Sequence, residues 1–177
     1  MSKLGLIQVY TGDGKGKTTA AIGLAARALG HGLKVCYINF HKGEHKDEHY
    51  GELKLLKQLG VDIYRFAERH PHFYKNEPVE KIRKECLLAL KFIEEIFQQK
   101  KYDMLILDEI LISVRDKFIS EEELLGLLNK KPENLEIILT GRSATEKIIQ
   151  IADLVSEIKK VKHPFDKGIQ RRKGIEY

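Results

Sequence analysis

The chain has 177 residues, of which 42% are hydrophobic and 32% charged. This length and composition fit one globular unit with a sizeable core, so we expect a single domain over residues 1–177. The net charge of +5 at pH 7 suits anionic ligands, but the lysines alternate with acids along the expected helices, which argues against nucleic acid as a partner. The cluster Arg171-Arg172-Lys173 is the local exception.

The two cysteines, Cys36 and Cys86, form neither a disulfide framework nor a metal-site spacing. Both fall in apolar runs, so we expect them to be buried packing residues in a reducing compartment. No apolar stretch is long enough to span a membrane. Residues 1–3 lead directly into the first expected strand and leave no room for a signal peptide. We therefore expect a cytoplasmic protein with no membrane partner.

In chain order, short apolar β-prone runs alternate with amphipathic runs. We expect strands at residues 4–10, 33–40, 61–66, 102–107, 135–140 and 154–158. Helical spacing predicts helices at residues 18–29, 50–59, 79–99 and 144–151, and a further helix that is capped by Ser120 with Glu123 and runs to Leu128. Residues 41–49, 67–78 and 160–177 are expected to be irregular. This alternation predicts an α/β fold of three layers with a mainly parallel six-stranded sheet.

Residues 11–19, Thr-Gly-Asp-Gly-Lys-Gly-Lys-Thr-Thr, join the first expected strand to the first helix. Glycines bring backbone N–H groups close to an anion, and a helix N-terminus adds unpaired donors and partial positive charge. Thr11 stands where the usual phosphate-binding pattern has glycine. A flexible turn is the alternative, but strand, loop and helix together predict a phosphate cradle. Its candidate residues are Gly12, Asp13, Gly14, Lys15, Gly16, Lys17, Thr18 and Thr19.

Two further polar groups follow expected strands. Asp108 and Glu109 end an apolar strand, and Arg142 follows the next one. The carboxyl ends of parallel strands share one edge of a sheet, so these residues should converge on the phosphate loop. Thr18, Asp108 and Glu109 are candidate Mg²⁺ ligands because Mg²⁺ prefers oxygen. The pattern predicts a site for Mg²⁺ and ATP, with Arg142 as a candidate nucleotide contact.

The segment 67–78 interrupts the alternation with aromatic residues and histidines. Phe73 and Tyr74 either bind a ligand or pack back on the core, and the composition leaves both readings open. Several histidines suggest a zinc site, but no acidic or thiol partner stands at ligand spacing, which disfavours it. The members of this set are His41, His45, His49, His70 and His72.

The residue types do not decide which bond is broken. Hydrolysis needs a directed water, for which Glu109 is a candidate base. A kinase needs an acceptor pocket, which the loop around Phe73 could build. Transfer of the adenosyl group needs a nucleophile at the ribose C5′, with Lys15, Lys17 and Mg²⁺ stabilising the leaving triphosphate.

The whole pattern resembles the ATP:cob(I)alamin (corrinoid) adenosyltransferases with a RecA-like P-loop fold. The resemblance begins with the phosphate loop and the run Ala-Ala-Arg-Ala-Leu-Gly-His-Gly, and covers essentially the full chain. It continues through residues 40–43, 107–109, 140–142 and 152–157, and closes with Lys-His-Pro-Phe-Asp-Lys-Gly at 162–168 and Gly-Ile-Glu-Tyr at 174–177. That family shares the Thr at the first loop position.

The resemblance implies transfer of the 5′-deoxyadenosyl group of ATP to the Co(I) of a reduced corrinoid, in cobalamin synthesis or salvage. It implies that ATP lies in reversed polarity, that Lys17, Thr18 and Glu109 are catalytic, and that Asp108 supports Mg²⁺. It also implies a homodimer and an electron donor such as a flavoprotein reductase. Members often have an N-terminal arm, which we do not expect here, and a corrinoid-facing Phe and Trp. This chain has no Trp, so Phe73 and Tyr74 are its candidate corrinoid contacts.

Two other functions remain open at this stage. One is a RecA-like ATPase or kinase that acts on another small molecule. The other is a protein that binds a corrinoid in an ATP-dependent manner without turnover. The reaction products distinguish all three hypotheses.

Overall fold

A parallel β-sheet forms the centre of the molecule. The computed structural model describes residues 4–43, 50–71, 74 and 77–176. Within them, six strands pair in the order β3-β2-β4-β5-β1-β6, and each pairing is parallel. The strands are β1 (Ile7–Thr11), β2 (Val35–Phe40), β3 (Asp62–Phe66), β4 (Met104–Asp108), β5 (Glu136–Thr140) and β6 (Leu154–Glu157).

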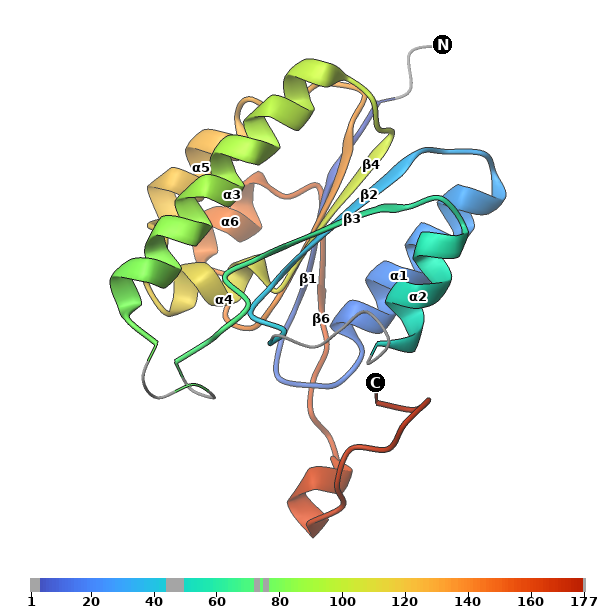
Figure 1. Cartoon of the computed structure of the whole chain (residues 1–177), viewed down its shortest axis with the longest axis vertical. Coiled ribbons are helices and arrows are strands. Elements are labelled where there is room, and N and C mark those ends of the chain that lie inside the picture. Colours follow the sequence, from blue (N-terminus) through green and yellow to red (C-terminus); the bar gives the residue numbers. More distant parts are fainter. Residues whose placement is uncertain (1–3, 44–49, 72–73, 75–76, 177) are drawn as a thin grey trace.

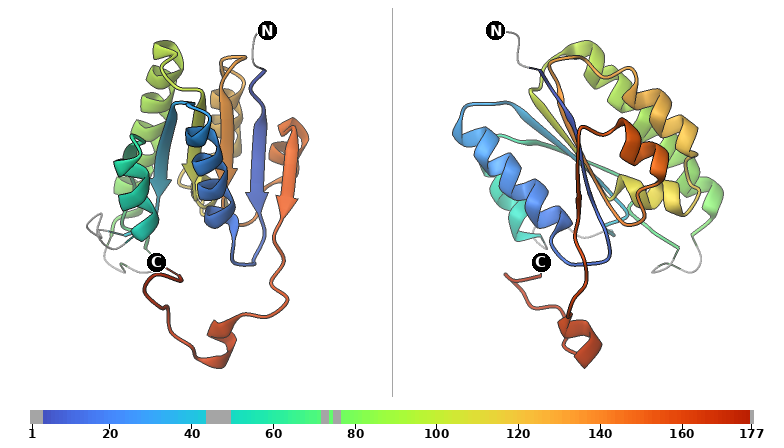
Figure 2. Two further views of the ribbon diagram at one scale, coloured as in Figure 1. Left: turned by 90° about the vertical axis from the view of Figure 1, so that its right-hand side faces the viewer. Right: turned by 180° about the vertical axis from the view of Figure 1, so that it is seen from behind.

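Helices cover both faces of this sheet (Figures 1 and 2). One face packs against α1 (Lys17–Gly30) and α2 (Gly51–Gln58). The other packs against α3 (Val79–Gln99), α4 (Ile110–Arg115), α5 (Glu121–Leu128) and α6 (Glu146–Ile151). The prediction of a three-layer α/β fold is confirmed, and the fold is consistent with a RecA-like P-loop domain.

Local sequence signals account for several of these elements. The apolar face of α3 is buried as its spacing predicts, from Ile82 to Phe97. The capping box of α5 is present: Ser120 Oγ accepts from the Glu123 N–H, and Glu123 accepts from the Ser120 N–H. Cys36 and Cys86 are free and buried, as expected. No helix in the described residues has the length and apolar character to cross a membrane.

The structure also contains elements that the sequence pattern did not predict. Helix α4 was missed because its residues Ile110 to Val114 are all buried, so no apolar stripe alternates with a polar face. Helix α6 begins later than expected because Thr145 caps it by accepting from the Ile148 N–H. The tail is not wholly irregular, since Pro164–Lys167 forms the short 3₁₀ helix η2.

The parallel pairing brings the carboxyl ends of the strands to one edge, at the bottom of Figure 1. The phosphate loop follows β1 there, and Glu109 follows β4. The segment 41–43 follows β2, and residues 67–71 follow β3. This edge is where ligands bind in open α/β sheets.

Candidate active site

The phosphate loop leaves β1 and enters α1 through two glycines in a left-handed conformation. Gly12 has φ 101° and Gly16, which caps α1, has φ 133°. A Cβ atom on Gly12 would lie 2.5 Å from the carbonyl oxygen of Ile158. The N–H of Gly14 donates to the same oxygen at 2.7 Å. Glycine is required at position 12 because the chain that follows β6 lies directly against the loop, and at position 16 because of its positive φ.

Thr11, which replaces the usual glycine, has a structural role. It is buried at the end of β1, and its hydroxyl oxygen accepts a hydrogen bond from the N–H of Ala144 at 3.1 Å. Ala144 belongs to the segment after β5 that also carries Arg142. The threonine therefore joins the phosphate loop to this neighbouring segment.

The side chain of Lys17 is held inside the loop. Its Nζ donates to the carbonyl oxygens of Gly12 and Gly14 at 2.7 and 2.8 Å. Burial lowers the pKa of Lys17, and the nearby Glu109 carboxylate opposes this effect. Thr18 and Thr19 lie in the first turn of α1, where Thr19 is exposed.

Asp108 lies at the centre of a buried polar cluster. Its side chain is fully buried. Its Oδ1 accepts from the hydroxyls of Thr18 at 2.9 Å and Thr140 at 2.6 Å. Its Oδ2 accepts from the Tyr37 hydroxyl at 2.6 Å and lies 3.0 Å from Lys42 Nζ. These four partners occupy the positions at which a carboxylate accepts hydrogen bonds.

The charges of this cluster depend on one another. Burial alone would raise the pKa of Asp108, but the Lys42 ammonium and the hydrogen bonds from Thr140 and Tyr37 outweigh it and lower this pKa. Lys42 is affected in the opposite sense: burial would lower its pKa, but Asp108 and Glu109 hold it above the ordinary value. The cluster therefore contains an ionised pair, Asp108 and Lys42, with Thr18 bonded to both at 2.9 and 3.1 Å.

Glu109 begins the turn into α4 with φ 65°, a left-handed conformation. Its N–H donates to the Thr140 hydroxyl at 2.9 Å, which fixes the turn relative to β5. Its half-buried carboxyl has a raised pKa because it is desolvated and stands beside Asp108. Arg142 reaches Asp13 of the phosphate loop at 3.5 Å, and both side chains are largely exposed.

Three members of the Asp108 cluster were missed as site residues on sequence alone. Tyr37 lies in β2, Lys42 follows the end of β2, and Thr140 is the last residue of β5. The available signal for Lys42 and Thr140 was their position at strand ends on the predicted edge. Tyr37 had no such signal, because its phenol reaches Asp108 from inside an apolar strand.

The chain matches a described protein family and several named relatives over nearly its whole length. Residues 3–177 match the family described as ATP:corrinoid adenosyltransferase BtuR/CobO/CobP. The corrinoid adenosyltransferase CobA of Salmonella typhimurium is 37% identical over 173 residues, which are 98% of this chain and 86% of that protein. The corrinoid adenosyltransferase of Escherichia coli (strain K12) is 38% identical over the same shares of the two chains. That of Sinorhizobium sp is 35% identical over 98% of this chain and 80% of its own length.

This chain belongs to the ATP:corrinoid adenosyltransferase family. The resemblance seen in the sequence is thereby confirmed, and membership gives the protein the class of a transferase. The phosphate loop and the Asp108 cluster lie at the edge of the sheet where ligands bind in open α/β folds.

The segment that is expected to face the corrinoid follows β3 at the same edge of the sheet. Its residues 72–73 and 75–76 lie outside the described residues, so the structure does not place Phe73. Tyr74 lies under the guanidinium of Arg69, whose Cζ is 5.8 Å from the ring centroid, and its N–H donates to the His70 carbonyl. Among the described residues these contacts hold Tyr74 within its own segment, and no hydrogen bond, ion pair or ring contact joins it to the phosphate loop.

Two predicted histidines meet beside this segment. The rings of His41 and His70 pack edge to face with centroids 5.1 Å apart. His41 Nδ1 donates to the Ala67 carbonyl at 3.1 Å, and its Nε2 accepts from the Ser113 hydroxyl at 2.8 Å, an assignment that follows from the carbonyl being an acceptor only. Within the described residues no three histidine, cysteine or acidic side chains are placed to hold a metal. His45, His49 and His72 are outside this range.

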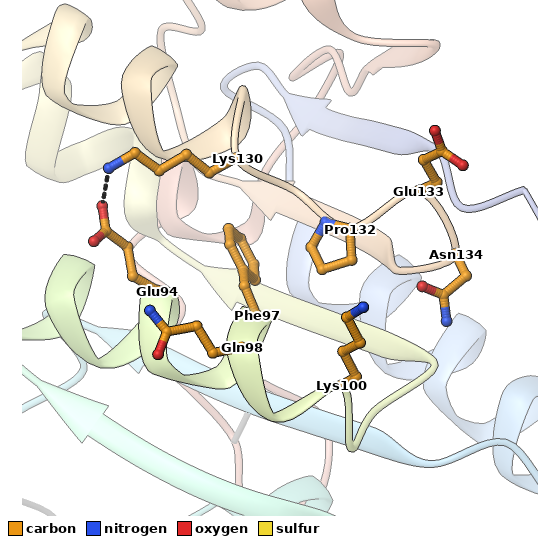
Figure 3. A pocket seen from close by; sticks show the side chains of 8 residues that line it. All are labelled: Glu94, Phe97, Gln98, Lys100, Lys130, Pro132, Glu133 and Asn134. Atoms are coloured by element: carbon orange, nitrogen blue, oxygen red, sulfur yellow. Dashed lines mark hydrogen bonds and ion pairs between the residues drawn. The ribbon is translucent and has the colours of Figure 1, made fainter.

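The pocket drawn in Figure 3 lies away from this site. It has a volume of about 590 Å³ and is bordered by the end of α3 and the turn before β5. Glu94 and Lys130 form an ion pair of 2.6 Å at its rim. These segments precede β4 and β5, so the pocket opens at the amino edge of the sheet and takes no part in the phosphate site.

Proposed function

We propose that this protein transfers the 5′-deoxyadenosyl group of ATP to the Co(I) of a reduced corrinoid and releases triphosphate. The observation that carries the proposal is the meeting of Lys17, Thr18, Asp108 and Lys42 at the phosphate loop in a member of this family. The family supplies the reaction, and the geometry supplies cations and hydroxyls where a polyphosphate needs them.

The bond changes define what the site must stabilise. The Co(I) electron pair forms the bond to C5′, the C5′–oxygen bond breaks, and triphosphate leaves with the electron pair of the broken C5′–oxygen bond. Negative charge therefore accumulates on the leaving oxygen. Lys17 inside the loop, Lys15 at its rim and Arg142 beside it are the cations proposed to face this charge, with the N–H groups of residues 12–19.

The oxygen groups at the site suit Mg²⁺. The Thr18 hydroxyl and the half-buried Glu109 carboxylate are hard oxygen donors on the phosphate side. Asp108 already contacts four protein groups, so its proposed role is to orient Thr18 and Lys42 rather than to bind the ion directly. When bound, Mg²⁺ would neutralise charge on the triphosphate.

The products test this proposal. The protein is incubated with ATP, Mg²⁺ and chemically reduced cobalamin, and the solution is assayed for adenosylcobalamin and inorganic triphosphate. We expect both, in equal amounts. ADP and phosphate would instead indicate the ATPase or kinase, and binding without any product would indicate the non-catalytic corrinoid-binding protein.

Four properties complete the proposal. We expect a homodimer: β6 is a sheet-edge strand whose Leu154 and Val155 are 42% and 38% exposed, which suits contact with a second copy. Light scattering after size exclusion tests this state. Cytoplasmic location and an electron-donating reductase are expected from the sequence, as is one domain over residues 1–177.

A further inference from the structure

The C-terminal segment begins and ends at the phosphate loop. At its start, the Ile158 carbonyl accepts from the Gly14 N–H at 2.7 Å. At its end, the Ile175 carbonyl accepts from Lys15 Nζ at 3.0 Å. Figures 1 and 2 show the chain leave the sheet below β6, pass through η2 and return toward the start of α1 and α2. Residues 158–176 therefore form a strap across one side of the phosphate loop.

The middle of this strap has few buried contacts. Val161 is 86% exposed and Phe165 is 71% exposed, although both are apolar. A segment with so little buried surface opens at low free-energy cost. Its two anchors at the loop therefore dominate its position, and the anchor at Lys15 is a single exposed lysine.

The returning end is a small folded unit. Glu176 accepts hydrogen bonds from the Arg172 N–H at 2.8 Å and from its guanidinium at 2.9 and 3.2 Å. These bonds, with a smaller contribution from the charge of Lys15, lower the pKa of Glu176 to about 2. Arg172 thus neutralises the carboxylate that stands 3.9 Å from Lys15.

The same end carries the basic cluster Arg171-Arg172-Lys173, whose side chains are exposed. Lys15 contacts Ile175 and Glu176, a few residues after the cluster. Before α2, the Tyr50 hydroxyl donates to the Lys42 carbonyl at 2.7 Å. Burial raises the pKa of Tyr50, while the charges of Lys42 and Arg171 oppose that rise, which agrees with Arg171 lying near the start of α2. The end of the chain that carries the cluster therefore lies beside Lys15 and near the starts of α1 and α2 (Figures 1 and 2).

We propose that residues 169–176 form a basic lid over the polyphosphate, in which Arg171 and Lys173 add cations to those of the phosphate loop. The lid rests on the proposed function, because its ligand is the triphosphate of that reaction. Because Arg172 already neutralises Glu176, the two remaining cations give this end a net attraction for phosphate.

Calorimetric titration of the full chain with inorganic triphosphate and Mg²⁺ tests the lid. We expect the double variant Arg171→Gln/Lys173→Gln to bind triphosphate about 10-fold more weakly than the parent chain, with a smaller difference in high salt. The double variant Lys162→Gln/Lys167→Gln is the matched control: it removes the same two charges from the part of the strap at and beside η2, far from the loop (Figure 1), and should bind as the parent does.

The unmodified protein provides a second measurement. Trypsin cleaves after exposed Arg171 and Lys173, and triphosphate should slow this cleavage several-fold while leaving cleavage after Lys130, in the turn after α5, unchanged. Unaltered affinity of the double variant, tighter binding by it, or absent protection would each overturn the lid. Failure of the phosphate site itself gives a different result: Lys17→Ala would then bind triphosphate as well as the parent.

Discussion

The carboxyl edge of the sheet has two halves, one around Asp108 and one around His41, which stabilise buried polar groups in opposite ways. On the phosphate side, a fully buried carboxylate is kept ionised by Lys42 and three hydroxyls. On the other side, His41 is buried and kept neutral, with one ring nitrogen donating to a carbonyl and the other accepting from Ser113. Charge compensation organises the first half, and aromatic packing with neutral hydrogen bonds organises the second.

One dipeptide connects the halves. His41 and Lys42 are adjacent, yet His41 packs toward His70 and Phe118, with ring centroids 5.1 and 5.4 Å away, while Lys42 reaches Asp108. His41 has φ 59°, and its N–H donates to the Ala67 carbonyl. This fixed turn sends the two side chains in different directions, so we infer that the neutral half positions a cation of the charged half.

The largest expected effect lies in the charged half. Lys17→Ala removes the ammonium group held inside the phosphate loop, so we expect kcat for adenosylcobalamin formation to fall by about 100-fold or more. Lys17→Arg is the control that keeps the charge but not the geometry. Retention of most activity by Lys17→Ala would show that the loop does not hold the triphosphate.

The second effect is on stability. Lys42→Met leaves the fully buried Asp108 without its cation, so we expect the free energy of unfolding to fall by about 3 kcal/mol in urea titrations. Adding Asp108→Asn should restore part of this loss, because the uncompensated charge is then gone. A loss in the double variant equal to the sum of the losses in Lys42→Met and Asp108→Asn alone would mean that the pair is not coupled.

The neutral half predicts a pH dependence. Burial lowers the pKa of His41 from 6.5 to about 4. The unfolded chain therefore binds the proton more readily, and stability should decrease as pH falls from about 6.5 toward 4, by about 2 kcal/mol between pH 7 and 5. Asp108 affects stability at lower pH. Its pKa is lowered, so its contribution to the free energy of unfolding is lost only as the pH falls below the ordinary range of aspartate.

His41→Gln should flatten the stability curve between pH 7 and 5 without changing its acid limb. Urea midpoints measured at several pH values provide the test. An unchanged slope in this variant would assign the dependence to another group and remove the contrast between the two halves.

The smallest effect concerns the segment after β3. Phe73→Ala should reduce kcat/KM for cobalamin with its lower axial base more than for truncated corrinoids, by roughly 10-fold, as for loss of one apolar contact. ATP binding should not change. Equal losses for both corrinoids would indicate that this aromatic residue only supports the loop.

The sequence by itself determined the alternation of strands and helices, the phosphate loop and the edge at which Asp108 and Glu109 stand. These features follow from local periodicity and from glycine and capping chemistry, which act over a few residues. Helix α4 could not be predicted in this way because Ile110 to Val114 are all buried, so no polar face alternates with an apolar one.

Only the tertiary structure decided which partners surround Asp108. Tyr37, Lys42 and Thr140 reach it from β2 and β5, strands that flank β4 in the sheet but are distant in the chain. It likewise decided that the tail returns to Lys15, across 160 positions of sequence. Such contacts depend on the order of the strands and, at Asp108, on a buried charge that requires a cation and hydrogen-bond donors around it. Neither requirement is visible in the spacing of neighbouring residues.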